Sequence, residues 1–261
     1  MARAARKRGR SLPGLAGYGL PVASFIVGIA FWEIYVRVFK VPAFLFPPPS
    51  AIVQVYFTGR IDWVGQTLVT LSEALFGLVI GVAVGFLIAL VITLSSFLNK
   101  ILMPYIVALQ VLPKVAIAPI LYILLGFSDT SRILLIVILT FFPIVINTST
   151  GLTDVDRNLV HLLKSLGARD TTIFFKVRLP NSLPYFFDGL KIGVSGALVG
   201  AIVAEFVSSS KGLGFLILNS QYTFNTVAAF GAFGILTVLG LFLYGGVILL
   251  GRQMMPWYRR N

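Results

Sequence analysis

Few side chains in this sequence could carry out catalysis, and they form no recognisable catalytic arrangement. The 261 residues include one histidine, His161, and no cysteine. One imidazole without any thiolate provides neither a metal cluster nor a nucleophile–base pair. A phosphate-binding Gly-x-x-x-x-Gly-Lys motif is also missing, since the sequence contains no Gly-Lys dipeptide. We therefore expect a protein that is not itself an enzyme and has no metal site or cofactor of its own.

One charged side chain, Lys114, lies near the middle of an apolar stretch and directly follows Pro113. An ammonium group inside a membrane is costly, so it should face a cavity, a carboxylate or a main-chain carbonyl. Pro113 removes one helix hydrogen bond and so frees such a carbonyl. Lys114 either donates a hydrogen bond to a carbonyl freed near Pro113 or lines a translocation path. Asn147, after Pro143, is a second candidate for that path.

A polar, amphipathic segment, residues 153–180, separates two apolar stretches and predicts a helix-turn-helix. Leucines spaced at i, i+3, i+4 and i+7 make one apolar stripe on its first helix. Such a pair of helices either lies on the lipid headgroups or presents a surface to a partner. The stripe consists of Leu159, Leu162, Leu163 and Leu166.

Residues that commonly cap helices set the expected limits of these two helices. Thr153 and Asp156 have capping-box spacing, and Gly167 stands where a left-handed C-terminal cap belongs. Asp170 can cap the second helix, which should stop before Pro180.

The elements that position these residues are membrane helices. Hydrophobic residues make up 57% of the chain, charged residues only 11%, and the mean hydropathy is +0.94. These values exclude an ordinary soluble domain and predict an all-α, polytopic membrane protein with about six spans. We read 212–225 as a loop or partial re-entrant turn. The expected spans lie within residues 12–32, 74–94, 101–125, 133–151, 184–207 and 227–250.

Basic residues concentrate before the first span, in the 153–180 loop and after the last span. The positive-inside rule then predicts that both termini and this loop are cytoplasmic. Because topology explains the net charge of +12, we expect no nucleic-acid partner. The expected organisation is a basic tail (1–14), one transmembrane domain (15–251) and a second basic tail (252–261).

Three glycines, Gly77, Gly81 and Gly85, lie on one face of the second span. Small residues at this spacing allow helix backbones to approach closely in lipid. They could pack within the subunit or at a homodimer interface.

The 153–180 loop resembles the cytoplasmic EAA loop of ABC-transporter permeases. In that family three residues separate Glu-Ala-Ala from a glycine, and nine more separate the glycine from Ile-x-Leu-Pro. Gly167 and the segment 177–180 fall on this pattern. The triplet itself is replaced. The resemblance implies that a separate ATP-binding subunit docks through His161, Leu162, Leu163, Lys164, Gly167, Ala168, Val177, Leu179 and Pro180.

Further segments extend the resemblance to roughly residues 20–250 and to the nitrate/sulfonate/taurine branch: the glycine ladder, LPKVAIAP, FFPIVIN and AEFVSSSKGLG. It implies a permease subunit of an ATP-driven importer in the cytoplasmic (inner) membrane. The implied partners are two copies of an ATPase that holds ATP and Mg, a second permease copy, an extracytoplasmic binding protein and membrane lipid.

The alternative interpretation is a stand-alone secondary transporter or channel. The branch suggests small anions such as sulfonate, nitrate or bicarbonate as the solute. LPKVAIAP together with FFPIVIN also resembles permeases of pyrimidine- or vitamin-precursor systems.

Overall fold

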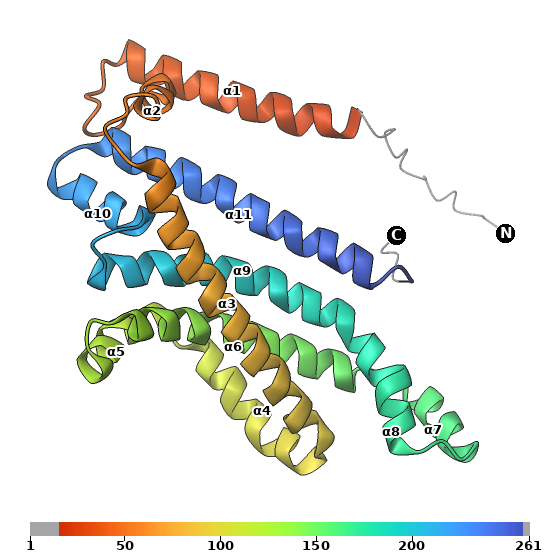
Figure 1. Cartoon of the computed structure of the whole chain (residues 1–261). Helices are drawn as coiled ribbons and strands as arrows, with labels where there is room; N and C mark the ends of the chain where they lie inside the picture. Colours follow the sequence, from red (N-terminus) through yellow and green to blue (C-terminus); the bar gives the residue numbers. More distant parts are fainter. Residues whose placement is uncertain (1–15, 258–261) are drawn as a thin grey trace.

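The computed structural model describes residues 16–257, and all regular secondary structure in this range is helical. Five of its helices are long and apolar enough to cross a membrane (Figure 1). They are α1 (Ala16–Val38), α3 (Trp63–Leu94), α6 (Asp129–Thr153), α9 (Leu179–Ser208) and α11 (Thr226–Met254).

The expected third span, near 101–125, is not one continuous helix, and its break falls at Pro113, one of the prolines that predict an interruption. It consists of α4 (Ser96–Val111), the 3-10 turn η1 (Lys114–Ile117) and α5 (Ala118–Leu125), with a bend of 88° between the two halves. The cause is Pro113, which lacks an amide hydrogen and keeps the preceding residue out of the helical region. Leu112 accordingly has an extended ψ of 139°.

The broken pair nevertheless joins opposite ends of the bundle. α3 ends beside the start of α4, and α6 begins near α5 at the other end (Figure 1). The chain between α3 and α6 must therefore run the length of the molecule. With this pair counted as one span, the prediction of about six membrane helices is confirmed.

The core is formed by α3, α6 and α9, which pack along most of their lengths (Figure 1). Gly77, Gly81 and Gly85 all face α6 in this contact. A Cβ added at Gly81 would lie 1.9 Å from Thr140 Oγ1, and one at Gly77 would lie 2.4 Å from Ile136 Cγ2. The glycine ladder thus lies in an intrachain helix contact.

The first helix is peripheral, and most of its described side chains are exposed. It is held at one end, where the Trp32 and Phe46 rings stack at 4.9 Å and Phe230 of α11 lies beside both. Glu33 also accepts hydrogen bonds from Ser50 in the short helix α2 (Pro49–Val55).

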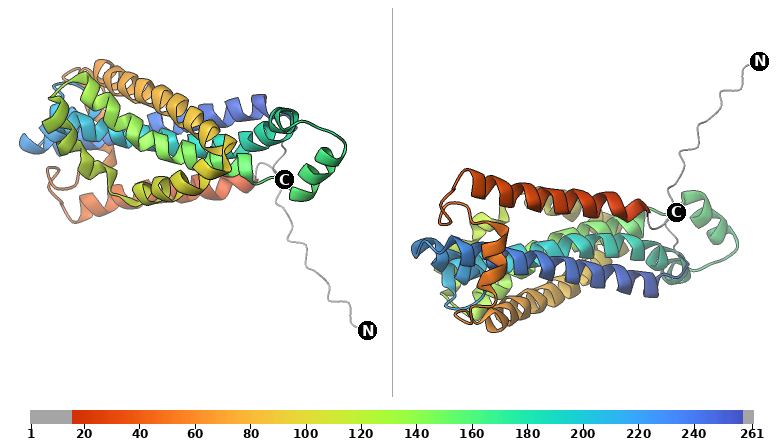
Figure 2. Two further views of the ribbon diagram at one scale, coloured as in Figure 1. Left: turned by 90° about the horizontal axis from the view of Figure 1, so that it is seen from below. Right: turned by 90° about the horizontal axis from the view of Figure 1, so that it is seen from above.

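The bundle has two ends, which we name by their short helices. The start of α1, the end of α11 and α7 (Arg157–Ser165) all lie at the α7 end, as both views of Figure 2 show. The opposite, α10 end carries α10 (Leu213–Tyr222). Residues 212–225 are mostly a short helix packed on α9 and α11. The loop alternative is therefore wrong, and the partial re-entrant turn stays a prediction.

Candidate functional site

The polar hairpin at the α7 end begins with a short exposed helix. Asp156 is its N-cap, and the Asp156 carboxylate accepts a hydrogen bond from Asn158 N at 2.8 Å. The proposed capping box is wrong at Thr153, which is the last residue of α6 and donates its hydroxyl to Ser149 O. The first helix therefore starts later than predicted, and three residues, 154–156, separate it from α6.

Gly167 ends this helix in the left-handed conformation that we predicted, with φ of +79°. Two hydrogen bonds complete the turn: Ala168 N donates to Leu163 O, and Gly167 N donates to Lys164 O, both at 3.0 Å. This pair of bonds is the Schellman motif, which satisfies the last carbonyls of a helix. The turn rigidly sets the direction of the following segment.

The second helix does not stop before Pro180, contrary to our prediction. α8 (Asp170–Ile173) continues through the π-helical turn η2 (Phe174–Arg178) into α9, with Pro180 in the first turn of α9. Proline is tolerated at such a position because the amide it lacks would not be needed there. Asp170 does not cap the helix by hydrogen bonding. It forms an ion pair with Lys164 at 2.8 Å.

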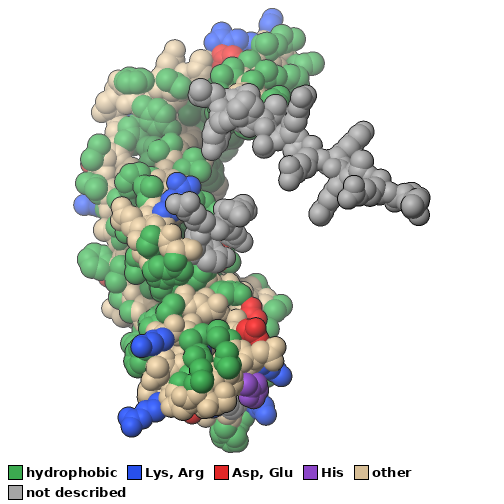
Figure 3. Space-filling view, turned by 90° about the vertical axis from the view of Figure 1, so that its right-hand side faces the viewer, with side chains coloured by type: hydrophobic (Ala, Val, Ile, Leu, Met, Phe, Trp, Pro, Cys, Tyr) green, Lys and Arg blue, Asp and Glu red, His purple; other side chains and the backbone are tan. Residues whose placement is uncertain are grey.

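None of the side chains of α7 is buried, and its leucine stripe is largely open. Leu162 is 56% exposed and Leu166 is 75% exposed. Figure 3 shows basic side chains around an apolar patch at the end of the molecule that α7 and α8 form. An apolar patch with a charged rim is typical of a contact with another protein or with a membrane surface.

The predicted docking residues do not form one surface. His161, Leu162, Lys164 and Gly167 are exposed on the hairpin, whereas the partly buried segment 177–180 lies at the junction with α9. The first group can contact a partner directly. The second connects the hairpin to the bundle.

A set of hydrogen bonds that the sequence analysis missed fastens this junction. The Asn181 amide donates to Gly151 O at 2.8 Å and to Asp154 O at 2.9 Å, and Tyr185 Oη donates to the Asp154 carboxylate at 2.5 Å. These bonds tie the end of α6 to the start of α9. A displacement of the hairpin would consequently act on both helices.

The two polar residues predicted for a path each donate to a main-chain carbonyl. Lys114 Nζ lies 2.7 Å from Gln110 O, whose helix is interrupted at Pro113, and 5.3 Å from the centroid of the Phe142 ring. Asn147 Nδ2 donates to Pro143 O at 2.8 Å, within the contact between α6 and α9. The Lys114 bond fits the structural alternative, and one bond leaves two ammonium hydrogens for another partner.

A buried polar cluster at the α10 end also escaped the sequence analysis. The Glu205 side chain is 1% exposed, and its carboxylate accepts a hydrogen bond from Gly214 N in the first turn of α10 at 2.5 Å. Gln66 and Thr70 of α3 accept hydrogen bonds from Gly212 N and Leu213 N. This cluster fixes the entry of α10 against α3 and α9.

Nearby, Arg132 connects three helices. Its guanidinium forms an ion pair with Glu73 of α3 at 2.9 Å and donates to Ser208 O of α9 at 2.9 Å. It also pairs with Asp129 on its own helix. The side chains of Arg132 and Glu73 are 15% and 13% exposed, so this ion pair is largely buried.

With this geometry established, the chain can be compared with known proteins. Residues 77–256 match the family described as binding-protein-dependent transport system inner membrane components. The chain belongs to this family. It is a multi-pass membrane permease, and the predicted resemblance to ABC-transporter permeases is confirmed.

Curated relatives align with this permease over nearly its full length. A probable ABC transporter permease protein of Haemophilus influenzae is 35% identical over 84% of this chain and 90% of its own length. The formylaminopyrimidine transport permease ThiX of Halalkalibacterium halodurans is 29% identical, covering 92% and 96%. The putative aliphatic sulfonates transport permease SsuC of Bacillus subtilis is also 29% identical, covering 95% and 91%. The sulfonate/taurine branch is thereby supported.

The fold of the permease also has a solved counterpart. The inward-facing MetNI methionine ABC transporter contains a chain that matches with a TM-score of 0.55 and 19% identity, covering 71% of this permease and 91% of that chain. At this identity the likeness establishes the shared fold.

Proposed function

We propose that this permease is the transmembrane subunit of an ATP-driven importer and that α7 and α8 form the docking surface for a separate ATP-binding subunit. The observation that carries the proposal is the exposed α7–α8 hairpin, joined to the bundle without a flexible linker. The permease belongs to a binding-protein-dependent family, which supports an extracytoplasmic binding protein as the second kind of partner. ATP and Mg belong to the ATPase, since the sequence has no phosphate-binding loop.

The hairpin has the mechanical properties that such docking requires. Its turn is set by a Schellman motif at Gly167, its second helix is continuous with α9, and Asn181 ties the junction to α6. A rigid-body movement of the ATPase would then move α6 and α9 together.

The assembly that we propose contains two permease copies and two ATPase copies in the cytoplasmic membrane. The α7 end faces the cytoplasm, because the basic residues of the 153–180 loop lie there and the positive-inside rule favours that orientation. The first turn of α1 and the last turn of α11 lie at the same end, which supports cytoplasmic termini.

The solute that we propose is a small anion such as a sulfonate, or a pyrimidine precursor. The names of the relatives SsuC and ThiX support these two classes. Lys114 is the residue we place on the path, since its ammonium lies at a break in a span and retains two donors. Asn147 is the second, because its polar side chain is half-buried in the same bundle.

Reconstitution in vesicles tests the proposed function. We expect the purified permease alone to neither bind nor hydrolyse ATP, and uptake to require the ATPase, the binding protein and ATP together. Uptake by the permease alone, driven by an ion gradient, would instead establish the stand-alone transporter. The choice of solute is tested separately by measuring which anions and heterocycles the binding protein binds.

Lys114 variants test the path. Lys114→Met keeps the stem and deletes the ammonium, whereas Lys114→Arg retains the charge. For an anionic solute we expect Met to lower ATP-driven uptake sharply and Arg to retain part of it, with melting temperatures like that of the parent. Normal uptake by the Met variant would remove Lys114 from the path. A loss of melting temperature, at a cost of about 1–3 kcal/mol for the unpaired carbonyl, would assign it a purely structural role.

A further inference from the structure

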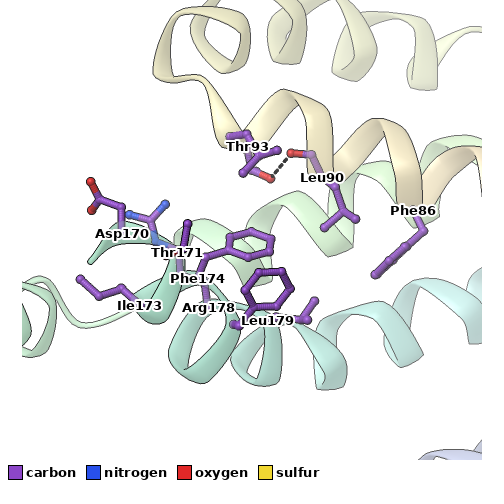
Figure 4. Close-up of a pocket in the computed structure, with 11 residues that line it drawn as sticks. Phe86, Leu90, Thr93, Asp170, Thr171, Ile173, Phe174, Arg178 and Leu179 are labelled. Atoms are coloured by element: carbon purple, nitrogen blue, oxygen red, sulfur yellow. Dashed lines mark hydrogen bonds between the residues drawn. The ribbon is translucent and has the colours of Figure 1, made fainter. Parts of the chain in front are cut away.

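A pocket of about 620 Å³ lies between the end of α3 and the segment that leads from α8 into α9. Figure 4 shows the rings of Phe86 and Phe174 facing this space from its two sides. It is separate from the exposed leucine stripe of α7, because none of the four leucines lines it. Its wall includes α8 residues and Leu179, which belong to the proposed docking region, but no docking or transport step proposed above uses the space itself.

The pocket is amphipathic along its length. Its inner part is apolar and is lined by Phe86, Leu90 and Phe174. Its other part carries polar side chains, contributed by Thr93, Asp170, Thr171 and Arg178. A ligand that fits must therefore have an apolar body and a polar head.

The charge at the polar part is positive. Asp170 forms an ion pair with Lys164 at 2.8 Å and also lies within the electrostatic influence of Arg178. Two cations thus surround one carboxylate, and the positive charge in excess is available to a ligand. An arginine in this position can bind an anionic group such as a phosphate with two parallel hydrogen bonds.

The depth of the pocket matches the surface of a bilayer. α3 has 32 residues and is about 48 Å long, longer than the hydrocarbon core of about 30 Å. Tilt and the two ends of the helix share the surplus length. We place Thr93 and Leu94 at the headgroups because α3 ends there and the chain turns into α4. Phe86 lies two turns deeper, about 12 Å along the helix. A phosphate at Arg178 would thus place acyl chains against Phe86 and Leu90.

We propose that this pocket binds one anionic phospholipid, with its phosphate on Arg178 and an acyl chain between α3 and the α8–α9 segment. The placement at a membrane surface rests on the proposed function, in which the α7 end faces the cytoplasm. The lipid would brace the junction at which the hairpin enters the bundle. It would link the composition of the inner leaflet to the stiffness of this junction.

The test uses the full-length permease, purified alone in detergent and stripped of lipid. Phosphatidylglycerol or phosphatidylcholine with identical acyl chains is added back, and bound lipid is counted by native mass spectrometry. We expect one retained phosphatidylglycerol per chain and a preference over phosphatidylcholine of about tenfold. Both lipids offer a phosphate to Arg178, but the choline group adds a cation beside the guanidinium and cancels the net charge of the lipid.

Three variants separate this site from general lipid adhesion. Arg178→Gln should reduce phosphatidylglycerol retention to the phosphatidylcholine level, and Leu90→Trp should fill the apolar part and lower retention of both lipids. Lys176→Gln removes a neighbouring exposed cation that does not line the pocket, and it should behave like the parent. Melting temperatures equal to that of the parent exclude misfolding as the cause.

Equal retention of the two lipids by the parent, or retention unchanged by both Arg178→Gln and Leu90→Trp, would overturn the proposal. So would a change of oligomeric state in Leu90→Trp without loss of lipid, which would assign the pocket to a second copy. Because the assay contains no ATPase, its failure is distinct from a failure of ATP-driven uptake.

Discussion

The two ends of this bundle are held together by different kinds of contact. At the α10 end, Glu205 and the Arg132–Glu73 ion pair are largely buried, and they join α3, α6, α9 and α10. At the α7 end, the Lys164–Asp170 pair is exposed, with side chains 52% and 83% accessible. Buried polar contacts are costly to break, whereas exposed ion pairs contribute little. The α10 end is thus fastened by buried charges. At the α7 end only the junction of α6 with α9 is fastened, by the Asn181 and Tyr185 hydrogen bonds, and α7 offers its surface to a partner.

Between these ends, small residues let the helix backbones touch. The seam of Gly77, Gly81 and Gly85 against α6 leaves no room for side chains. Close-packed interiors transmit displacements because they cannot be compressed. A movement of the hairpin at the α7 end can therefore reach the α10 end only if this glycine seam stays rigid.

The largest expected effect comes from breaking the fastened end. Arg132→Met leaves Glu73 charged and buried, and removal of one partner of such a pair costs about 3–5 kcal/mol. We expect this variant to lose more melting temperature than Gly81→Ala, Gly167→Val or Lys164→Gln. The double variant Arg132→Met, Glu73→Gln removes the buried charge and should recover part of the loss. If Arg132→Met alone melts like the parent, the ion pair does not fasten the α10 end.

The seam should respond next. In Gly81→Ala the new methyl group would lie 1.9 Å from Thr140 Oγ1, so α3 and α6 must separate, at a cost of about 1–3 kcal/mol. Gly245→Ala in α11 is the matched control, because a Cβ there meets nothing within 4 Å. Thermal unfolding in detergent should distinguish the two variants. Equal stability would mean that the seam is looser than the structure shows.

Substitutions at the α7 end should weaken assembly with the ATPase more than they lower the melting temperature. Gly167→Val forces a branched side chain into a left-handed conformation at a cost of roughly 1–2 kcal/mol, although the site itself is spacious. We expect the protein to remain in the membrane but to co-purify poorly with the ATPase. Gly167→Asn tolerates the left-handed conformation and should assemble normally. Normal assembly of the Val variant would contradict the docking role.

The smallest effect is expected at the exposed ion pair of the hairpin. Lys164→Gln removes the partner of Asp170, but both side chains are largely accessible to water. The melting temperature should not change measurably, because solvent screens such pairs. A clear loss of stability would show that the hairpin depends on this contact and is less open than its exposure indicates.

Much of the fold could be predicted because hydropathy is a local signal. The spans that correspond to α3, α6, α9 and α11 appear as long apolar runs in the sequence. In the third span the prolines predict an interruption, but neither they nor a hydropathy average gives the 88° bend at Pro113. A proline also misled us at position 180, where the missing amide suits the first turn of a helix.

Within the site, the local features were the predictable ones. The left-handed turn at Gly167 follows from glycine and its position at the end of a periodic stripe. The Glu205 cluster could not be found, because its partners Gln66 and Thr70 are more than 130 residues away in the sequence. Folding alone brings them together. The Asn181 bonds to the end of α6 were missed for the same reason.

The π-helical turn at Phe174–Arg178 has a consequence for how this protein can evolve. A π turn holds one residue more than the α-helical turn it replaces, and each residue of an α-helix adds about 100° of rotation. Deleting one residue from this turn would restore regular winding and rotate α8 and α7 by about 100° relative to α9. The docking face would then point sideways although every contact residue was still present. The number of residues in this segment thus sets the orientation of the docking face relative to α9. Insertions or deletions there should be far less tolerated than substitutions.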